Sequence, residues 1–181
     1  IDPSKIVLSE EEYLKIMQCT LAVEKNDTAR GVLNAATHIE KSFSYMDFLS
    51  GVPCRVRFDA LAGDVVVDIK TVNDGSVAAF GNSVAGFGYH LQAAHYIEGL
   101  RTLDPSRNWR FVFITLETQQ PFRCRVFEMS EESQLFAEGQ RMALLEDYAR
   151  RLKSGDWSEV GESEVTVLSL PNWYKSQRGM Q

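Results

Sequence analysis

The chain has 181 residues, 44% of them hydrophobic, and a formal net charge of -6 at pH 7. This length and apolar content suffice to bury one substantial core, and no repeat or long linker divides the sequence, so we expect a single domain over residues 1–181. The acidic balance argues against a general DNA-coating protein, because nonspecific affinity for DNA depends on basic side chains that release counterions.

Two helices are predicted at the start of the chain. Ser9 and Glu12 form a capping box before a helix whose apolar side chains recur at helical spacing. A second, shorter helix is predicted over 28–36. The apolar residues of the first helix are Tyr13, Ile16, Met17 and Leu21.

Three strands are predicted to follow. Over 38–46, apolar residues that include Ile39 alternate with polar ones, as in a half-buried strand. Two more strands are predicted over 52–59 and 64–70. The connection between them is short enough to return the chain antiparallel, which would place Asp59 beside Asp68.

The rest of the chain is predicted to hold two strands, two helices and an irregular end. In order, we expect a loop rich in Gly, Asn and Ser with a short helical turn (73–88), a helix that carries Gln92 (to about residue 101), a buried strand (110–116), a second strand (122–128) and a long helix (130–153) capped by Gly155. The residues after this helix are expected to be irregular and packed by the aromatic side chains of Trp157, Trp173 and Tyr174.

The strand over 64–70 carries the most informative residues. Asp68 and Lys70 share one face, because side chains alternate across a strand, and Ile69 between them is expected to face the core. With Asp59 beside Asp68, the two carboxylates and the Ile69 carbonyl could hold Mg²⁺, with Mn²⁺ as the alternative. Lys70 could then act on the attacking water or on charge in the transition state. This is the outline of a metal-dependent phosphodiesterase site.

A structural explanation of the same residues has to be weighed. An Asp-x-Lys pair on a strand is more often a solvated ion pair than a catalytic group. Here the pair ends the apolar run Val65–Val67, which is typical of a buried central strand, where an unpartnered charge is costly. Its position therefore favours a function.

Further candidates surround this pair. Gln92 and Tyr96 lie one turn apart with Tyr89 on one face of their helix, where they either join the site or pack in the core. Glu40 either adds a metal-binding carboxylate through water or is solvated. Arg55 and Arg57, on the Asp59 face, either meet phosphate or neutralise the acids. Five more arginines are candidates for the lining of a DNA channel, although Arg123 and Arg125 fit a solvated edge equally well: Arg101, Arg107, Arg110, Arg123 and Arg125.

Metal-binding and membrane motifs of other kinds are not found. His38, His90 and His95 lack metal-binding spacing, and the three cysteines lack the paired spacing of a zinc site, so we expect reduced thiols. Apolar runs are far shorter than the about 20 residues of a membrane span, and no signal-peptide pattern opens the chain. We expect a cytoplasmic protein that does not bind membranes.

The order of these elements and motifs resembles the PD-(D/E)XK nuclease superfamily, and within it the exonuclease VIII (RecE)-type phage recombination exonucleases. The resemblance implies an α/β fold in which helices flank a mixed central β-sheet. The motifs that carry it are Glu40-x-Ser42, Gly51-Val-Pro-Cys-Arg-x-Arg-x-Asp59, Asp68-Ile-Lys-Thr71, Gly88-Tyr-His-x-Gln92-Ala-Ala-x-Tyr96, Glu117 before Pro121, Gly155-Asp-Trp157 and Leu170-Pro-x-Trp173.

The same resemblance implies an activity. It points to Mg²⁺-dependent hydrolysis of linear double-stranded DNA from the 5′ end by a ring-shaped homo-oligomer, alongside a single-strand annealing recombination protein. One departure is that such enzymes carry an upstream helix with a Gly-x-x-x-His motif, which is not found before Ser9. Because the chain also begins at Ile1 rather than Met, we interpret it as the C-terminal part of a longer protein.

Two classes of function stay open at this stage. One is an exonuclease, and the other is a catalytically silent relative that binds DNA or protein. The joint presence of Asp59, Asp68 and Lys70 favours the enzyme, because a silent relative has no physical need for two acids and a lysine that converge.

Overall fold

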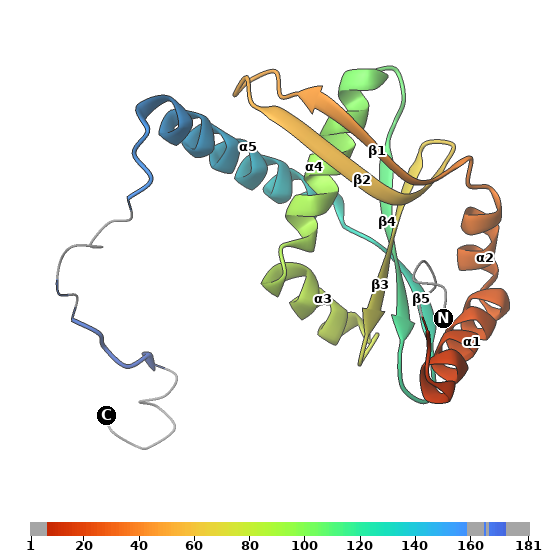
Figure 1. Cartoon of the computed structure of the whole chain (residues 1–181). Coiled ribbons are helices and arrows are strands. Elements are labelled where there is room, and N and C mark those ends of the chain that lie inside the picture. Colours follow the sequence, from red (N-terminus) through yellow and green to blue (C-terminus); the bar gives the residue numbers. More distant parts are fainter. Residues whose placement is uncertain (1–6, 159–164, 166, 173–181) are drawn as a thin grey trace. The chain divides into compact units, whose positions relative to one another are not determined.

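The structure is a computed structural model that describes residues 7–158, 165 and 167–172. It divides into two units, residues 1–149 and residues 150–181. The first unit contains the β-sheet and nearly all the helices, and it carries every candidate site residue (Figure 1). A single domain over the whole chain stays a prediction.

A five-stranded mixed sheet forms the centre of the first unit. Its strands lie in sequence order, and all neighbouring pairs are antiparallel except β3 and β4, which are parallel. The strands are β1 (His38–Met46), β2 (Pro53–Ala62), β3 (Val65–Val72), β4 (Arg110–Glu117) and β5 (Cys124–Glu128). The predicted α/β fold with a mixed central sheet is confirmed.

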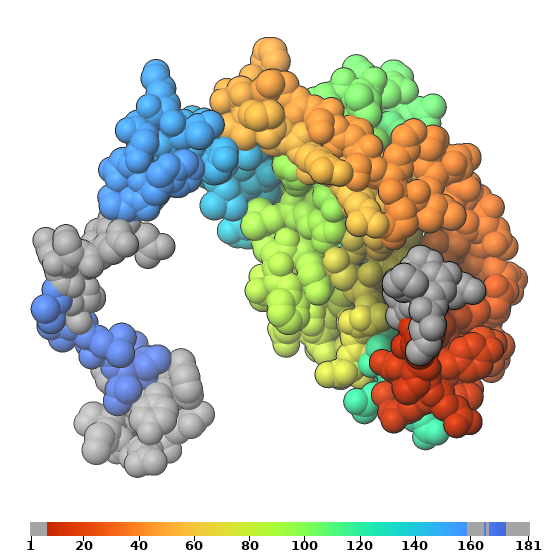
Figure 2. Space-filling view, in the orientation of Figure 1, coloured from red at the N-terminus to blue at the C-terminus, as the bar shows by residue number. Residues whose placement is uncertain are grey.

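Helices cover both faces of this sheet. Parallel strands need a long crossover, and here α3 and α4 supply it between β3 and β4. Figure 2 shows these yellow-green helices on one side of the molecule and the red to orange α1 and α2 on the other. The helices are α1 (Glu10–Lys25), α2 (Asp27–Asn34), α3 (Val77–Gly86), α4 (Tyr89–Leu103) and α5 (Glu131–Ser154).

The core has a separate cluster on each face of the sheet. On the α4 side, buried Phe58, Val66 and Leu100 belong to a cluster rich in aromatic rings. On the α2 side, Ala60 and Val67 pack with smaller aliphatic side chains. Phe58 and Ala60 would share a face in a regular strand, so β2 changes face at Asp59, the residue between them.

Helix α3 differs from the sequence-based expectation. The 73–88 region was expected to be a loop with one helical turn, because glycine and asparagine are frequent there. It holds a helix of 10 residues, whose N-cap Ser76 accepts a hydrogen bond from the Ala79 N–H. Phe80 is 2% exposed and anchors the helix on the sheet, so burial outweighs the low helix propensity of its glycines.

Several side chains are more exposed than their patterns predict. The capping box of α1 is confirmed, but this helix has no buried residue, so its apolar stripe is open to solvent. Ile39 is also exposed, at the end of β1. Gly155 follows α5 with a φ of 72°, as expected of a glycine cap, and Trp157 is 51% exposed. Trp173 and Tyr174 lie outside the described residues.

A buried ion pair fixes the hairpin of β1 and β2 to α5. Arg141 Nη1 lies 2.7 Å from Asp47 Oδ2, and Asp47 also accepts hydrogen bonds from the N–H and hydroxyl of Ser50. Burial alone would raise the pKa of Asp47, but the hydrogen bonds from Ser50 and Arg141 outweigh it and lower the pKa to about 2.

Asp47→Asn is expected to lower the free energy of unfolding by at least about 2 kcal/mol at pH 7. The folded pKa is depressed, so this stability is present above the ordinary pKa of 3.8 and is lost as the pH falls toward about 2. Urea unfolding over this pH range should therefore show the two proteins converging in acid. Asp64→Asn, in the exposed β2–β3 turn, is the control and should change little. A gap between wild type and Asp47→Asn that did not depend on pH would contradict the assignment.

Candidate active site

Strand β3 carries an ion pair at the centre of the candidate site. Lys70 Nζ lies 2.7 Å from Asp68 Oδ2, which confirms that the two side chains share a face. The Asp68 side chain is 4% exposed and that of Lys70 is 19% exposed. The pair is therefore largely buried, whereas an Asp-x-Lys pair without a function was expected to be solvated.

Gln92 on α4 completes a closed network with this pair. Its Nε2 donates to Asp68 Oδ1 at 2.7 Å, and its Oε1 accepts from Lys70 Nζ at 3.0 Å. The crossover of α3 and α4 brings the first turns of α4 over β3, so an amide at this position reaches both charged groups. The structure thus places Gln92 against Lys70, as its helix spacing predicts.

Tyr89, which the sequence placed on the same helix face as Gln92 without a separate role, contacts Lys70. Lys70 Nζ lies 4.2 Å from the centre of the Tyr89 ring, a cation–π contact that holds the ammonium over β3. Tyr89 precedes Gln92 by three residues, so both project from one helix face. That spacing was the signal available in the sequence.

Asp59 approaches the pair from β2. The β2–β3 ladder ends at the pair Ala60 and Val67, and one further step of this register would set Asp59 opposite Asp68. The ladder stops there, and Asp59 Oδ2 instead accepts a hydrogen bond of 2.7 Å from the Ile69 N–H. A carboxylate thus takes the place of backbone pairing where the two strands separate.

The electrostatics of Asp68 reflect this crowding. Burial raises the pKa of the Asp68 carboxyl, the ion-paired Lys70 lowers it, and the negative charge of Asp59 raises it again. The net shift is upward. The anionic form of Asp68 is therefore less favoured than in water, and additional positive charge would stabilise it.

A divalent cation fits that need. Asp68 Oδ2 is buried and, although it lies close to Lys70, it accepts no hydrogen bond from the described residues. Within those residues, no three or more His, Cys, Asp or Glu side chains cluster to hold a metal. An ion here would therefore rest on Asp59, Asp68 and the Ile69 carbonyl, with water and phosphate as the other ligands, which is the usual pattern for Mg²⁺.

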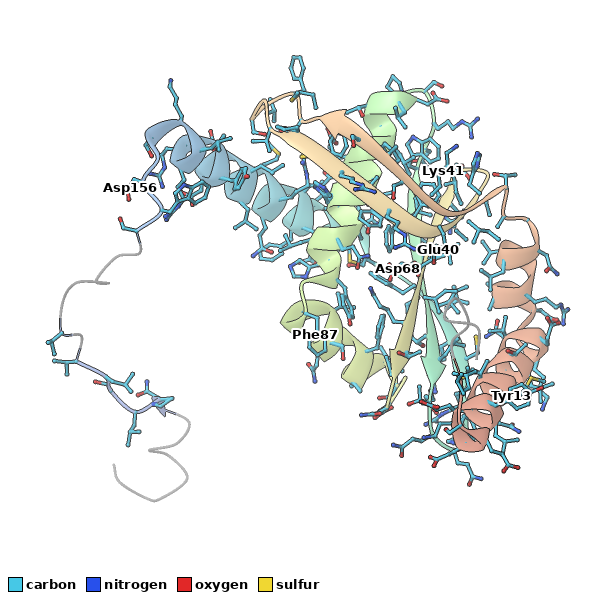
Figure 3. All side chains as sticks on the ribbon, viewed as in Figure 1. Tyr13, Glu40, Lys41, Asp68, Phe87 and Asp156 are labelled. Atoms are coloured by element: carbon cyan, nitrogen blue, oxygen red, sulfur yellow. The ribbon has the colours of Figure 1, made fainter. Side chains whose placement is uncertain are left out.

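Glu40 lies near these carboxylates but has another partner. The register of β1 and β2 sets it across from Asp59, and its left-handed backbone, with a φ of 52°, interrupts the ladder there. Its side chain forms an ion pair with Arg57. In Figure 3, Glu40 and Asp68 are labelled in the same part of the sheet. Its role as a water-mediated metal ligand stays a prediction, as does phosphate binding by Arg57.

One expectation about side-chain direction needs correction. Ile69 was expected to face the core but is 37% exposed, because the ladder of β3 with β2 has ended at Val67. Tyr96 packs in the core with its ring centroid 6.0 Å from that of Phe111. The structure gives Tyr96 a packing role, and its part in catalysis stays a prediction without a supporting contact.

The arginines expected along a channel are mostly engaged elsewhere. Four of them form ion pairs with carboxylates: Arg101 with Glu138, Arg107 with Asp104, Arg110 with Glu128 and Arg123 with Glu117. Arg55 shares the exposed face of β2 with Arg57, and its side chain has no hydrogen bond or ion pair within the described residues. Arg55 is therefore the better candidate for a phosphate contact.

A comparison of the sequence with known families decides the assignment. The profile of the PDDEXK-like domain of unknown function (DUF3799) matches residues 2–164. The chain belongs to this family. Among proteins with curated descriptions, none matches it at a significant level. No helix in the described part of the PDDEXK-like chain is both long and apolar enough to cross a membrane.

One solved structure agrees with the PDDEXK-like fold. A crystal structure of a protein from Eubacterium rectale, named "Putative exonuclease", is similar at a TM-score of 0.59 and 14% identity, over 94% of this chain and 67% of the other. A second crystal structure, named SSO0001, matches 73% of this chain and 60% of its own at 15% identity, with a TM-score of 0.37 that is too low to indicate a shared fold. The first likeness supports the fold.

Gln92→Ala in the PDDEXK-like chain is expected to reduce cleavage of DNA more than stability. Gln92 holds Asp68 and Lys70 in one geometry, yet it is only partly buried, so its loss lets water replace its hydrogen bonds. We expect about a tenfold lower rate and a small change in melting temperature. Both should be measured on one preparation. A large drop in melting temperature with an unchanged rate per folded molecule would identify Gln92 as a structural residue only.

Proposed function

We propose that this chain is the nuclease domain of a divalent-metal-dependent exodeoxyribonuclease that hydrolyses phosphodiester bonds of linear double-stranded DNA. The observation that carries the proposal is the closed network of Asp68, Lys70 and Gln92 beside Asp59, on a PDDEXK-like fold. These groups converge at the point where β2 and β3 separate.

Each residue has a distinct role in this proposal. Asp59, Asp68 and the Ile69 carbonyl would hold Mg²⁺, with Mn²⁺ as the alternative and Glu40 as a ligand through water. The ion supplies positive charge to the phosphate and makes a nearby water more acidic. Lys70 donates a hydrogen bond to the water or to the phosphate oxygens as negative charge develops. Gln92 orients the lysine.

The finer assignment rests on the resemblance to RecE-type exonucleases and on the name of the Eubacterium rectale protein. By that likeness the enzyme degrades one strand from its 5′ end, acts as a ring-shaped homo-oligomer and works with a single-strand annealing protein in recombination. Two carboxylates and a lysine are enough for hydrolysis, whereas strand polarity requires DNA contacts beyond these groups.

The test compares linear with closed circular duplex DNA in the natural full-length protein. With Mg²⁺ we expect loss of the linear form only, and faster release of a 5′ label than of a 3′ label. Addition of a chelator should stop the reaction. Binding of linear DNA without cleavage, in Mg²⁺ and in Mn²⁺, would instead identify the chain as a catalytically silent relative.

A further inference from the structure

A hollow with a volume of about 520 Å³ opens beside Lys70, at the carboxyl end of β3. Its walls come from the end of β3, the loop before α3, the end of β4 and the connection between α3 and α4. We call it the Phe87 hollow. The residues that define it are Thr71, Asn73, Asp74, Phe87, Tyr89 and Thr118.

The hollow adjoins the active site through Tyr89. The Tyr89 ring contacts Lys70 and also lines the hollow. A DNA strand whose phosphate lies at Asp68 and Lys70 would therefore have the hollow within reach of the nucleotide that carries this phosphate.

One wall of the hollow is an exposed aromatic platform. The Phe87 ring lies 5.6 Å from that of Tyr89, at an angle of 32° between the ring planes. Phe87 is 72% exposed, and Figure 3 labels it at the connection between α3 and α4. Exposed aromatic rings of this kind are the surfaces on which unpaired bases stack.

The polar wall suits a neutral ligand with a hydrogen-bonding edge. Thr71, Asn73 and Thr118 make no side-chain hydrogen bond within the described part of the chain, so their groups are free to bind a ligand. Asp74 is the one acid on the wall, and hydrogen bonds from Ser76 lower the pKa of its carboxyl, so it is an anion at neutral pH. A phosphate would be repelled there, whereas a base would not.

The loop that forms this wall is fixed by a hydrogen bond to a buried glutamate at the end of β4. Gly75 N–H donates to Glu117 Oε1 at 2.9 Å, and Glu117 is 2% exposed and ion-paired with Arg123. A Cβ on Gly75 would lie 3.3 Å from Glu117 Oε1, so a larger residue would have to displace this side chain by a few tenths of an ångström. The hollow is therefore formed before a ligand binds, which reduces the ordering cost of binding.

We propose that the Phe87 hollow is a nucleobase subsite, in which a base next to the scissile phosphate stacks on Phe87 and presents its edge to Thr71, Asn73 and Thr118. This inference rests on the proposed nuclease function. A base inside a duplex is already stacked on its neighbours, so occupancy of the hollow requires that the base leave the duplex. The subsite thus selects DNA whose end is unpaired or opens easily.

The kinetic test uses two linear duplexes that differ only at their ends. One has normal terminal nucleotides, and the other has abasic terminal nucleotides on both strands. Phe87→Ala in the full-length protein should slow cleavage of the normal duplex by about tenfold, since loss of one stacked base typically costs from about fivefold to a hundredfold in binding. The abasic duplex should be cleaved slowly by wild type and by Phe87→Ala alike. Phe87→Trp should restore the rate on normal ends.

A binding test separates this inference from the proposed function. With Ca²⁺ in place of Mg²⁺, a terminal 2-aminopurine should lose fluorescence when wild type binds, and should lose less with Phe87→Ala or Asn73→Ala. Leu103→Ala, at the exposed end of α4, is the matched control and should behave as wild type.

If wild type cleaves no DNA but still quenches 2-aminopurine, the hollow binds a base and the nuclease proposal fails. Equal slowing of both duplexes by Phe87→Ala, with unchanged quenching, would overturn the nucleobase assignment.

Discussion

Lys70→Ala should lower the cleavage rate of linear duplex DNA by about a hundredfold to a thousandfold while leaving metal affinity nearly unchanged. Lys70 carries a positive charge, donates a hydrogen bond to Gln92 and is ion-paired with Asp68, so it cannot itself be a ligand of a cation. Its loss removes a donor aimed at charge that develops only during the reaction. Calorimetry with Mn²⁺ and single-turnover cleavage, on the same preparation, measure the two quantities separately.

The control for this variant is another lysine on the same sheet. Lys41 lies on β1 and is exposed, so Lys41→Ala removes the same charge outside the network. We expect it to cleave at nearly the wild-type rate. Lys70→Arg should stay impaired, because a planar guanidinium cannot occupy the ammonium position between Gln92 and the Tyr89 ring. An equal loss of metal affinity and of cleavage rate in Lys70→Ala would remove the distinction between ligand and donor.

The fold was predictable where local pattern and burial agree. The alternating β1 and β2, the apolar β4 and the capping box of α1 each have a periodicity that leaves one interpretation. Helix α3 was not predictable in this way, because its glycines and asparagine favour a loop locally. Only the crossover between parallel strands, which buries Phe80 on the sheet, makes a helix there the stable choice.

The site was predictable where the periods of strands and helices determine which side chains share a face. The two-residue spacing of Asp68 and Lys70 and the three-residue spacing of Tyr89 and Gln92 each determine a shared face. The periods do not determine where a ladder ends, so the exposed side chain of Ile69 could not be foreseen.

Long-range partners were also beyond the sequence. Arg57 on β2 pairs with Glu40 on β1, and Arg110 on β4 pairs with Glu128 on β5. Each arginine taken alone resembles a phosphate ligand, and only the register of the sheet shows which of them are already neutralised. The Phe87 hollow likewise depends on the loop before α3 and the end of β4 meeting, which no local pattern encodes.

Asp68→Asn is expected to lower the rate of metal-dependent cleavage at least about a thousandfold without destabilising the metal-free protein. The amide keeps the shape of the side chain, and its oxygen can still accept the hydrogen bond from Gln92, but it lacks the charge that holds a cation. Cleavage rates in Mg²⁺ and in Mn²⁺, together with melting temperatures with and without metal, test both parts of this expectation.

The effect of Asp68→Asn on the stability of the metal-free protein should depend on pH. Burial and Asp59 raise the folded pKa of Asp68, so its contribution to stability is complete below the ordinary value of 3.8 and is lost as the pH rises through the folded pKa. At neutral pH the metal-free wild type therefore carries the cost of an ionised buried carboxylate, which Asp68→Asn avoids. The melting temperature of the variant should match or exceed that of wild type at pH 7, and the gap should close in acid. Mg²⁺ should then stabilise wild type at pH 7 but not the variant, since a bound cation offsets the cost of the ionised carboxylate only where that carboxylate is present. If the metal-free variant melted well below wild type at every pH, Asp68 would be a residue that stabilises the fold rather than a metal ligand.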